Sequence, residues 1–91
     1  MKIVIVGAGK VGYSLAQRLI QDDHDVYVID RSPERIHNLE NTLDVSLVLG
    51  NGSDVQLLNE IDMSDVGMFI AVTDSDEVNM LSCSVAKIKG V

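Results

Sequence analysis

The chain has 91 residues, 46% of them hydrophobic, and a formal net charge of −7 from 14 acidic and 7 basic side chains. This composition allows one globular domain or part of one, and the acidic balance argues against binding to the phosphate backbone of nucleic acids. The single cysteine excludes an internal disulfide, and no apolar run approaches the roughly 20 residues that cross a bilayer. We therefore expect a cytoplasmic protein without direct membrane insertion.

Four apolar runs rich in β-branched residues alternate with four segments of helical periodicity. The runs are predicted to be strands and cover residues 3–6, 26–29, 45–49 and 68–72. Because each run is continuously apolar, helices should cover both faces of a parallel sheet. The pattern predicts an α/β fold with a doubly wound, Rossmann-like sheet in the strand order 3-2-1-4.

Polar side chains mark where the predicted helices begin. Ser32 followed by Pro33 is typical of an N-cap and the first helical residue, and Ser53 with Gln56 matches a capping box. The first helix is expected over residues 11–21, and the fourth is expected to open near residues 74–77. Apolar stripes are predicted to face the sheet. In the first helix the stripe consists of Val11, Leu15 and Leu19, with Ala16 and Ile20 beside them, and in the fourth helix it consists of Val78, Leu81, Val85 and Ile88.

The sheet is expected to be truncated to four strands. Gly90-Val91 stands where a further strand would begin, and a complete doubly wound sheet usually has about six. We therefore expect residues 1–91 to form one nucleotide-binding domain that is incomplete at its C-terminus. The fourth strand would then offer an open edge to another chain.

A glycine-rich hexad follows the first strand and opens the first helix. Its residues are Gly7, Ala8, Gly9, Lys10, Val11 and Gly12, which match the dinucleotide-binding pattern G-x-G-x-x-G. Gly7 would permit the tight turn, Gly9 would admit a pyrophosphate, and Gly12 would let the helix lie close to the strand. Without the strand before it and the helix after it, the hexad would equally suit a simple turn. With them, the helix N-terminus adds an anion-binding site.

Asp30 ends the second strand 18 residues after Gly12, close to the spacing of the carboxylate that binds ribose hydroxyls. A 2′-phosphate there would meet a like charge, which favours NAD or adenosine nucleotides over NADP. Arg31 is either a solvated side chain or a contact to adenine or phosphate. Because the first and fourth strands adjoin in the order 3-2-1-4, Thr73 should face the glycine turn across a cleft.

Other polar clusters are better explained without a ligand. Carboxylates at the start of the fourth helix complement the helix dipole, although they could hold a cation beside phosphates. Residues 22–25, Asp-Asp-His-Asp, fall in an expected polar turn, so we predict no metal site. Cys83 is predicted to pack within the fourth helix.

Three blocks resemble the RCK family, the regulator-of-potassium-conductance or Trk-system N-terminal nucleotide-binding domain. They are residues 2–12, Gly50-Asn51-Gly52-Ser53-Asp54 and residues 71–83, of which the last is the most specific. The resemblance implies a cytoplasmic, homo-oligomeric regulatory subunit that binds NAD(H) or ATP/ADP. Its partner would be a potassium-transporting membrane protein, and it would lie at the inner face of the membrane through that partner.

The resemblance also assigns roles to individual positions. By matching position, Asp30 and Arg31 would contact the adenosine ribose, Asn51 and Gly52 would border the adenine with Ser53 in the same turn, and Val72 and Thr73 would line the cleft beside the phosphates. The stretch at residues 51–53 would also suit an ordinary turn with a helix cap. Asn79 matches a family position without an assigned role.

The opening hexad also occurs in dehydrogenases, so the N-terminal half of an NAD-dependent dehydrogenase is the alternative. The chain has no Tyr-x-x-x-Lys pattern and no Ser/Cys–His arrangement for hydride-transfer chemistry. It also has no G-x-x-x-x-G-K-[S/T] pattern of a P-loop enzyme. We therefore predict a regulatory binding domain and no enzymatic activity.

Overall fold

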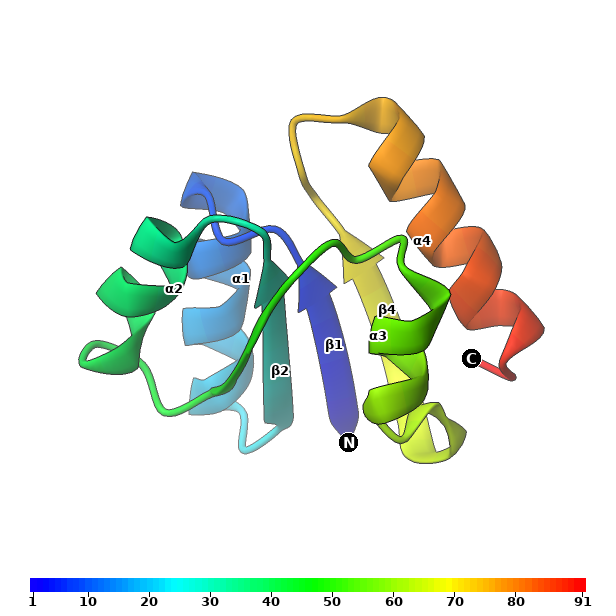
Figure 1. Ribbon diagram of the computed structural model, residues 1–91. Coiled ribbons are helices and arrows are strands. Elements are labelled where there is room, and N and C mark those ends of the chain that lie inside the picture. Colours follow the sequence, from blue (N-terminus) through cyan, green and yellow to red (C-terminus); the bar gives the residue numbers. More distant parts are fainter.

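The computed structural model describes residues 1–91 and confirms a four-stranded parallel sheet in the order β3-β2-β1-β4 (Figure 1). The strands are β1 (Lys2–Val6), β2 (Asp25–Asp30), β3 (Ser46–Leu49) and β4 (Val66–Ala71). The fourth strand begins two residues earlier than predicted, because Val66 pairs with Lys2 before an irregularity in the register. β1 and β4 adjoin, so the strand order reverses between them.

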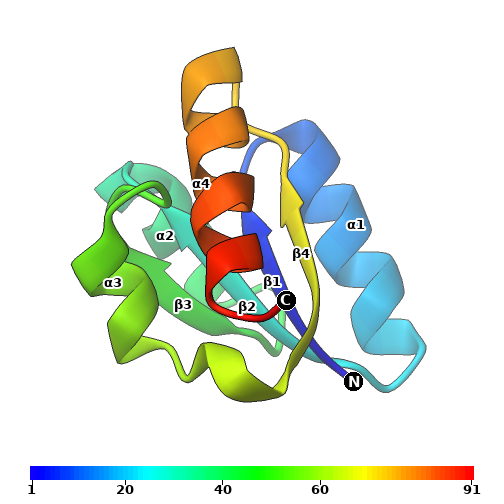
Figure 2. The ribbon, with the colours of Figure 1, turned by 90° about the vertical axis from the view of Figure 1, so that its right-hand side faces the viewer.

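Helices lie on both faces of the sheet, as predicted from the continuously apolar strands (Figures 1 and 2). They are α1 (Lys10–Gln21), α2 (Pro33–Glu40), α3 (Val55–Glu60) and α4 (Asp76–Ile88), with a short 3₁₀ helix η1 (Met63–Asp65) before β4. Alternate side chains of β1 pack against the helices on the two faces of the sheet. Val4 packs with Leu58 of α3 and Ala86 of α4, whereas Ile5 packs with Ala16 of α1.

The predicted inward faces of α1 and α4 are partly wrong. Leu81 and Ile88 of α4 are 57% and 85% exposed, while Ser82 and Ala86 are buried. In α1, Val11 is 59% exposed, but Ala16 is buried and Leu15, Leu19 and Ile20 pack against the core as predicted. Small side chains let a helix lie close to the sheet, so α4 turns Ser82 and Ala86 toward it. Val78 and Val85 of the predicted stripe still pack against the core. Cys83, expected to be packed, is exposed.

The helix caps confirm the prediction for α2 and correct it for α3. The Ser32 hydroxyl accepts a hydrogen bond from the Arg35 amide, as an N-cap should. For α3 the cap is Asp54, whose carboxylate accepts from the Gln56 amide at 3.0 Å. Ser53 donates both its amide and its hydroxyl to the Asn51 side chain, so the helix begins one residue later than predicted.

The glycine turn between β1 and α1 depends on two of its three glycines. Gly7 has a φ of +115°, and a Cβ there would lie 2.9 Å from the carbonyl oxygen of Val72. A Cβ on Gly12 would lie only 1.8 Å from the carbonyl oxygen of Gly7. A Cβ on Gly9 would meet no atom within 4 Å. Packing therefore requires glycine at positions 7 and 12, whereas position 9 is open.

The opposite end of the sheet is held by the amino group of Lys2. It donates to the backbone oxygen of Asp62 at 2.8 Å and to the carboxylate of Asp65 at 3.0 Å, and it lies 4.7 Å from the ring centre of Tyr27. The Asp62 carboxylate in turn accepts from the hydroxyl and amide of Ser64. These two hydrogen bonds, with the charge of Lys2, lower the pKa of Asp62.

Replacing Gly12 with alanine should destabilise the fold by about 1–3 kcal/mol, because the new methyl group must displace α1 from the Gly7 carbonyl. Denaturant unfolding of the variant would measure this loss. Gly9→Ala is the matched control and should change the free energy of unfolding by less than about 1 kcal/mol. Equal losses for the two variants would show that the close approach at Gly12 does not limit the packing of α1.

Replacing Asp62 with asparagine should lower stability at neutral pH and matter less in acid. Because the folded-state pKa of Asp62 lies below its usual value of 3.8, its ionised form stabilises the fold above that pH, and this contribution is lost as the pH falls through the lowered pKa. Denaturant unfolding of both proteins should show that the difference between their free energies of unfolding is smaller at acidic than at neutral pH. A difference that stays constant would contradict this role, and Asp44→Asn, at an exposed position, is the control.

Candidate functional site

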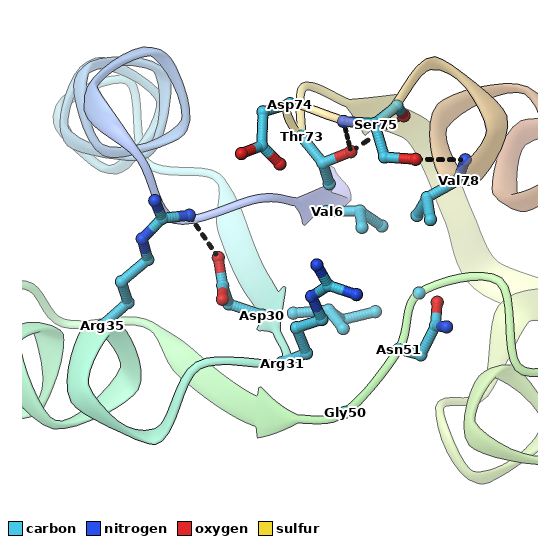
Figure 3. A pocket seen from close by; sticks show the side chains of 12 residues that line it. Val6, Asp30, Arg31, Arg35, Gly50, Asn51, Thr73, Asp74, Ser75 and Val78 are labelled. Atoms are coloured by element: carbon cyan, nitrogen blue, oxygen red, sulfur yellow. Dashed lines mark hydrogen bonds and ion pairs between the residues drawn. The ribbon is translucent and has the colours of Figure 1, made fainter.

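A cleft opens at the carboxyl ends of the strands, between the end of β1 and the loops after β2, β3 and β4. The space in and above it, including the part open to solvent, is about 390 Å³. Five of the predicted cofactor-binding residues line it: Asp30, Arg31, Asn51, Gly52 and Thr73 (Figure 3). They lie at or just after the ends of three different strands, so the parallel sheet brings together positions that are far apart in the sequence.

The glycine hexad borders this cleft without lining it. Ala8, Gly9 and Lys10 line a neighbouring hollow between α1 and α2. Gly7 instead lies against the backbone of Val72 and Thr73, and Gly12 lies against the backbone of Gly7. The remaining predicted residues, Val11, Ser53 and Val72, line neither the cleft nor the hollow. A ligand that spans both regions would have to pass over the loop between β1 and α1.

Asp30 connects the cleft to the glycine turn. Its side chain is only 6% exposed. One carboxylate oxygen accepts from the amide of Ala8 at 2.7 Å, and the other accepts from the amide of Ser32 at 2.8 Å. Each oxygen has a second lone pair, so the carboxylate can accept further hydrogen bonds from hydroxyl groups in the cleft. Asp30 therefore has a structural role and keeps the capacity to bind a diol.

Arg35 of α2 is a site residue that the sequence analysis missed. Its guanidinium lies 3.6 Å from the Asp30 carboxylate, and its half-exposed side chain lines both the cleft and the hollow beside the glycine turn. Figure 3 shows it reaching toward Asp30 from the side opposite Asn51. The Ser32-Pro33 cap was the available signal, because it places Arg35 in the first turn of a helix that starts directly after β2.

The wall of the cleft opposite Asp30 is the loop between β4 and α4. Thr73, Asp74 and Ser75 from this loop and Val78 from α4 line it. Ser75 caps α4, because its hydroxyl accepts from the amide of Val78 at 3.2 Å (Figure 3). Thr73 is tied to the side chain of Asn79 in the second turn of the helix. Apart from Thr73, sequence reasoning did not place these side chains in the cleft.

The first amide groups of α1 are available for a ligand. Its N-cap is Gly9, which has no side chain to cap the helix, and an α-helix leaves its first N–H groups without internal partners. Such groups bind anions, particularly phosphate. No three His, Cys, Asp or Glu side chains are grouped to hold a metal ion. None of the helices is long and apolar enough to span a bilayer.

Comparison with solved structures supports the fold. The NAD(P)-binding domain of an exopolyphosphatase-related protein from Archaeoglobus fulgidus superposes with a TM-score of 0.86 over 97% of this chain and 65% of that one. The two sequences are 20% identical. The likeness is therefore one of architecture, and it agrees with the predicted Rossmann-like sheet.

Sequence relatives carry more specific names. Trk system potassium uptake protein TrkA from Halomonas elongata is 44% identical over 94% of this chain, and the protein of the same name from Azorhizobium caulinodans is 46% identical over 93%. The chain spans only 19% of each of these proteins. It spans 40% of a TrkA homolog from Methanothermobacter thermautotrophicus, to which it is 40% identical.

The family comparison covers nearly the whole chain, since the TrkA-N domain matches residues 3–91. This range includes the glycine turn, Asp30 and the loop after β4. The RCK-type resemblance drawn from the three sequence blocks is thereby confirmed. With its parallel four-stranded sheet and a cleft at the point where the strand order reverses, the chain belongs to the TrkA-N domain family.

Proposed function

We propose that this chain is a nucleotide-sensing regulatory domain that binds NAD(H) or ATP/ADP and controls a potassium uptake transporter or channel in the membrane. The observation that carries the proposal is the buried Asp30 carboxylate, which sits between the cleft and the glycine turn. A carboxylate that can bind a diol and the open amides of α1 lie at the same end of the sheet, which suits an adenosine attached to phosphates. The names of the potassium uptake relatives support the choice of partner.

The ligand would lie with its adenosine over the carboxyl end of β2. Asp30 would accept hydrogen bonds from the ribose hydroxyls, with Arg31 beside them. Asn51 and Gly52 would border the adenine, and Ser53 would support that turn through its bonds to Asn51.

The phosphates would lie across the loop after β1. They would bind the open amides at the start of α1, above Gly9, where no side chain fills the space. Ala8, Lys10 and Val11 would flank them, while Gly7 and Gly12 keep the turn tight. Val72 and Thr73 would form the facing wall. Each of these residues would therefore contribute a charge, a backbone donor or space for the phosphates to approach the chain.

The regulatory role is favoured over the dehydrogenase alternative. The residues that line the cleft supply charge and hydrogen bonds, and the relatives compared above bear the names of potassium uptake proteins. We infer that the domain acts as a homo-oligomer at the cytoplasmic face of the membrane, attached through its transporter. The open edge of β4, where Met68 is 45% exposed, supports contact with a further chain.

Calorimetric titration of the protein with NAD, NADH, ATP, ADP and NADP tests the proposal. We expect binding of NAD(H) or of ATP/ADP, and weaker binding of NADP because its 2′-phosphate would meet the Asp30 carboxylate. Parallel assays for hydride transfer should show no turnover with hydroxy or amino acids. Turnover would establish the dehydrogenase alternative, and a lack of binding to every nucleotide would leave the glycine turn a purely structural feature.

Replacing Asp30 with alanine should weaken every adenosine ligand by about 1.5–3 kcal/mol, the scale of a hydrogen bond to a charged group. Because Asp30 also holds the amides of Ala8 and Ser32, the variant should lose some stability, and its folding must be verified by circular dichroism. The control is Asp44→Ala, an exposed carboxylate near the opposite end of the strands. Unchanged affinity in a folded Asp30 variant would exclude it as the ribose ligand.

A further inference from the structure

We propose that Asn79 is a positioning residue that holds Thr73, and with it the loop after β4, in the conformation that lines the nucleotide cleft. Its side-chain oxygen accepts from the amide and the hydroxyl of Thr73, at 3.0 and 2.6 Å. Its side-chain nitrogen donates to the carbonyl oxygen of Thr73 at 3.0 Å. One side chain therefore satisfies both backbone polar groups of a single cleft residue.

This arrangement replaces a missing strand partner. The last backbone bond from this part of the chain to β1 runs from the amide of Val72 to the carbonyl of Val6, at 2.8 Å. Thr73 is the first residue beyond that ladder. The amide group of Asn79 presents a donor and an acceptor side by side, as the backbone of a neighbouring strand would. It thereby extends the ordered wall of the cleft by one residue past the sheet.

The position of Asn79 is itself fixed by α4. Its backbone amide donates to the carbonyl oxygen of Ser75 at 3.0 Å, which is the first hydrogen bond of the helix. The amide of Ser75 donates to the Thr73 hydroxyl at 3.1 Å. The loop and the first turns of α4 thus form one hydrogen-bonded unit. A ligand that touches Thr73 or Ser75 would act on the start of α4 through these contacts.

Side-chain chemistry makes asparagine hard to replace here. Aspartate would keep the oxygen that faces the Thr73 amide and hydroxyl, but its second oxygen would face the Thr73 carbonyl without a proton between them. Alanine would remove all three hydrogen bonds and leave the half-buried amide of Thr73 without its acceptor. We therefore expect a graded series in which Asn79→Ala has the larger effect and Asn79→Asp the smaller.

The role rests on the proposed nucleotide binding, so the test measures affinity and loop order separately. Calorimetry with ADP and NADH should show an affinity about tenfold weaker for Asn79→Ala. A tenfold change corresponds to the net contribution of about one hydrogen bond, which here orders the loop. The affinity of Asn79→Asp should lie between those of the wild-type protein and Asn79→Ala. This variant replaces Asn79→Ala in the test if the alanine variant folds poorly. Asn59→Ala, an exposed asparagine on α3 that binds Lys89, is the matched control and should bind normally.

Amide hydrogen exchange without ligand supplies a readout independent of binding. In Asn79→Ala the amides of Thr73 and Ser75 should exchange faster, while the amides of β1 and α1 stay unchanged. Wild-type exchange at Thr73 or wild-type affinity for ADP and NADH in this variant would overturn the positioning role alone. If the unaltered protein binds neither nucleotide, the proposed function falls and the positioning role with it. The two failures are therefore distinguishable.

Discussion

The close approach of Gly12 to the carbonyl of Gly7 is the constraint on which the arrangement of the site depends. A single added carbon at Gly12 would lie 1.8 Å from that oxygen, so α1 can begin directly above the end of β1 only because both positions lack side chains. This contact sets the height of α1 over the sheet. The N-cap, Gly9, has no side chain to bind the first amides of the helix, so these amides stay open beside the hollow between α1 and α2.

Asp30 and the loop after β4 complete the site from two sides. The Asp30 carboxylate binds the turn after β1 and the start of α2 at once, which fixes β1, β2 and α2 relative to one another at the cleft. On the other side, Asn79 carries the order of β4 past its last ladder bond to Thr73. In both places a buried or half-buried polar side chain satisfies backbone groups that the sheet leaves unpaired.

The rotation of α4 has the same physical origin as the glycine turn. Ser82 and Ala86 face the sheet because small residues allow the helix to lie close to it, and the Ser82 hydroxyl bonds to the carbonyl of Val78 within the helix. The larger Leu81 and Ile88 are consequently directed away from the core. Hydrophobic periodicity predicts that the largest apolar side chains face the sheet. Close packing of the helix on the sheet instead favours small side chains at these positions.

The sequence by itself determined the strand order, the helical layers and the position of the cleft, because continuous apolar runs, the glycine hexad and Asp30 each have one common structural use in alternating βα units. Only the tertiary structure decided which helix faces are buried, since that depends on the distance between a helix and the sheet. It also brought in Arg35 and gave Asn79 its contact with Thr73. Those contacts join residues through space across turns, and neither periodicity nor spacing encodes them.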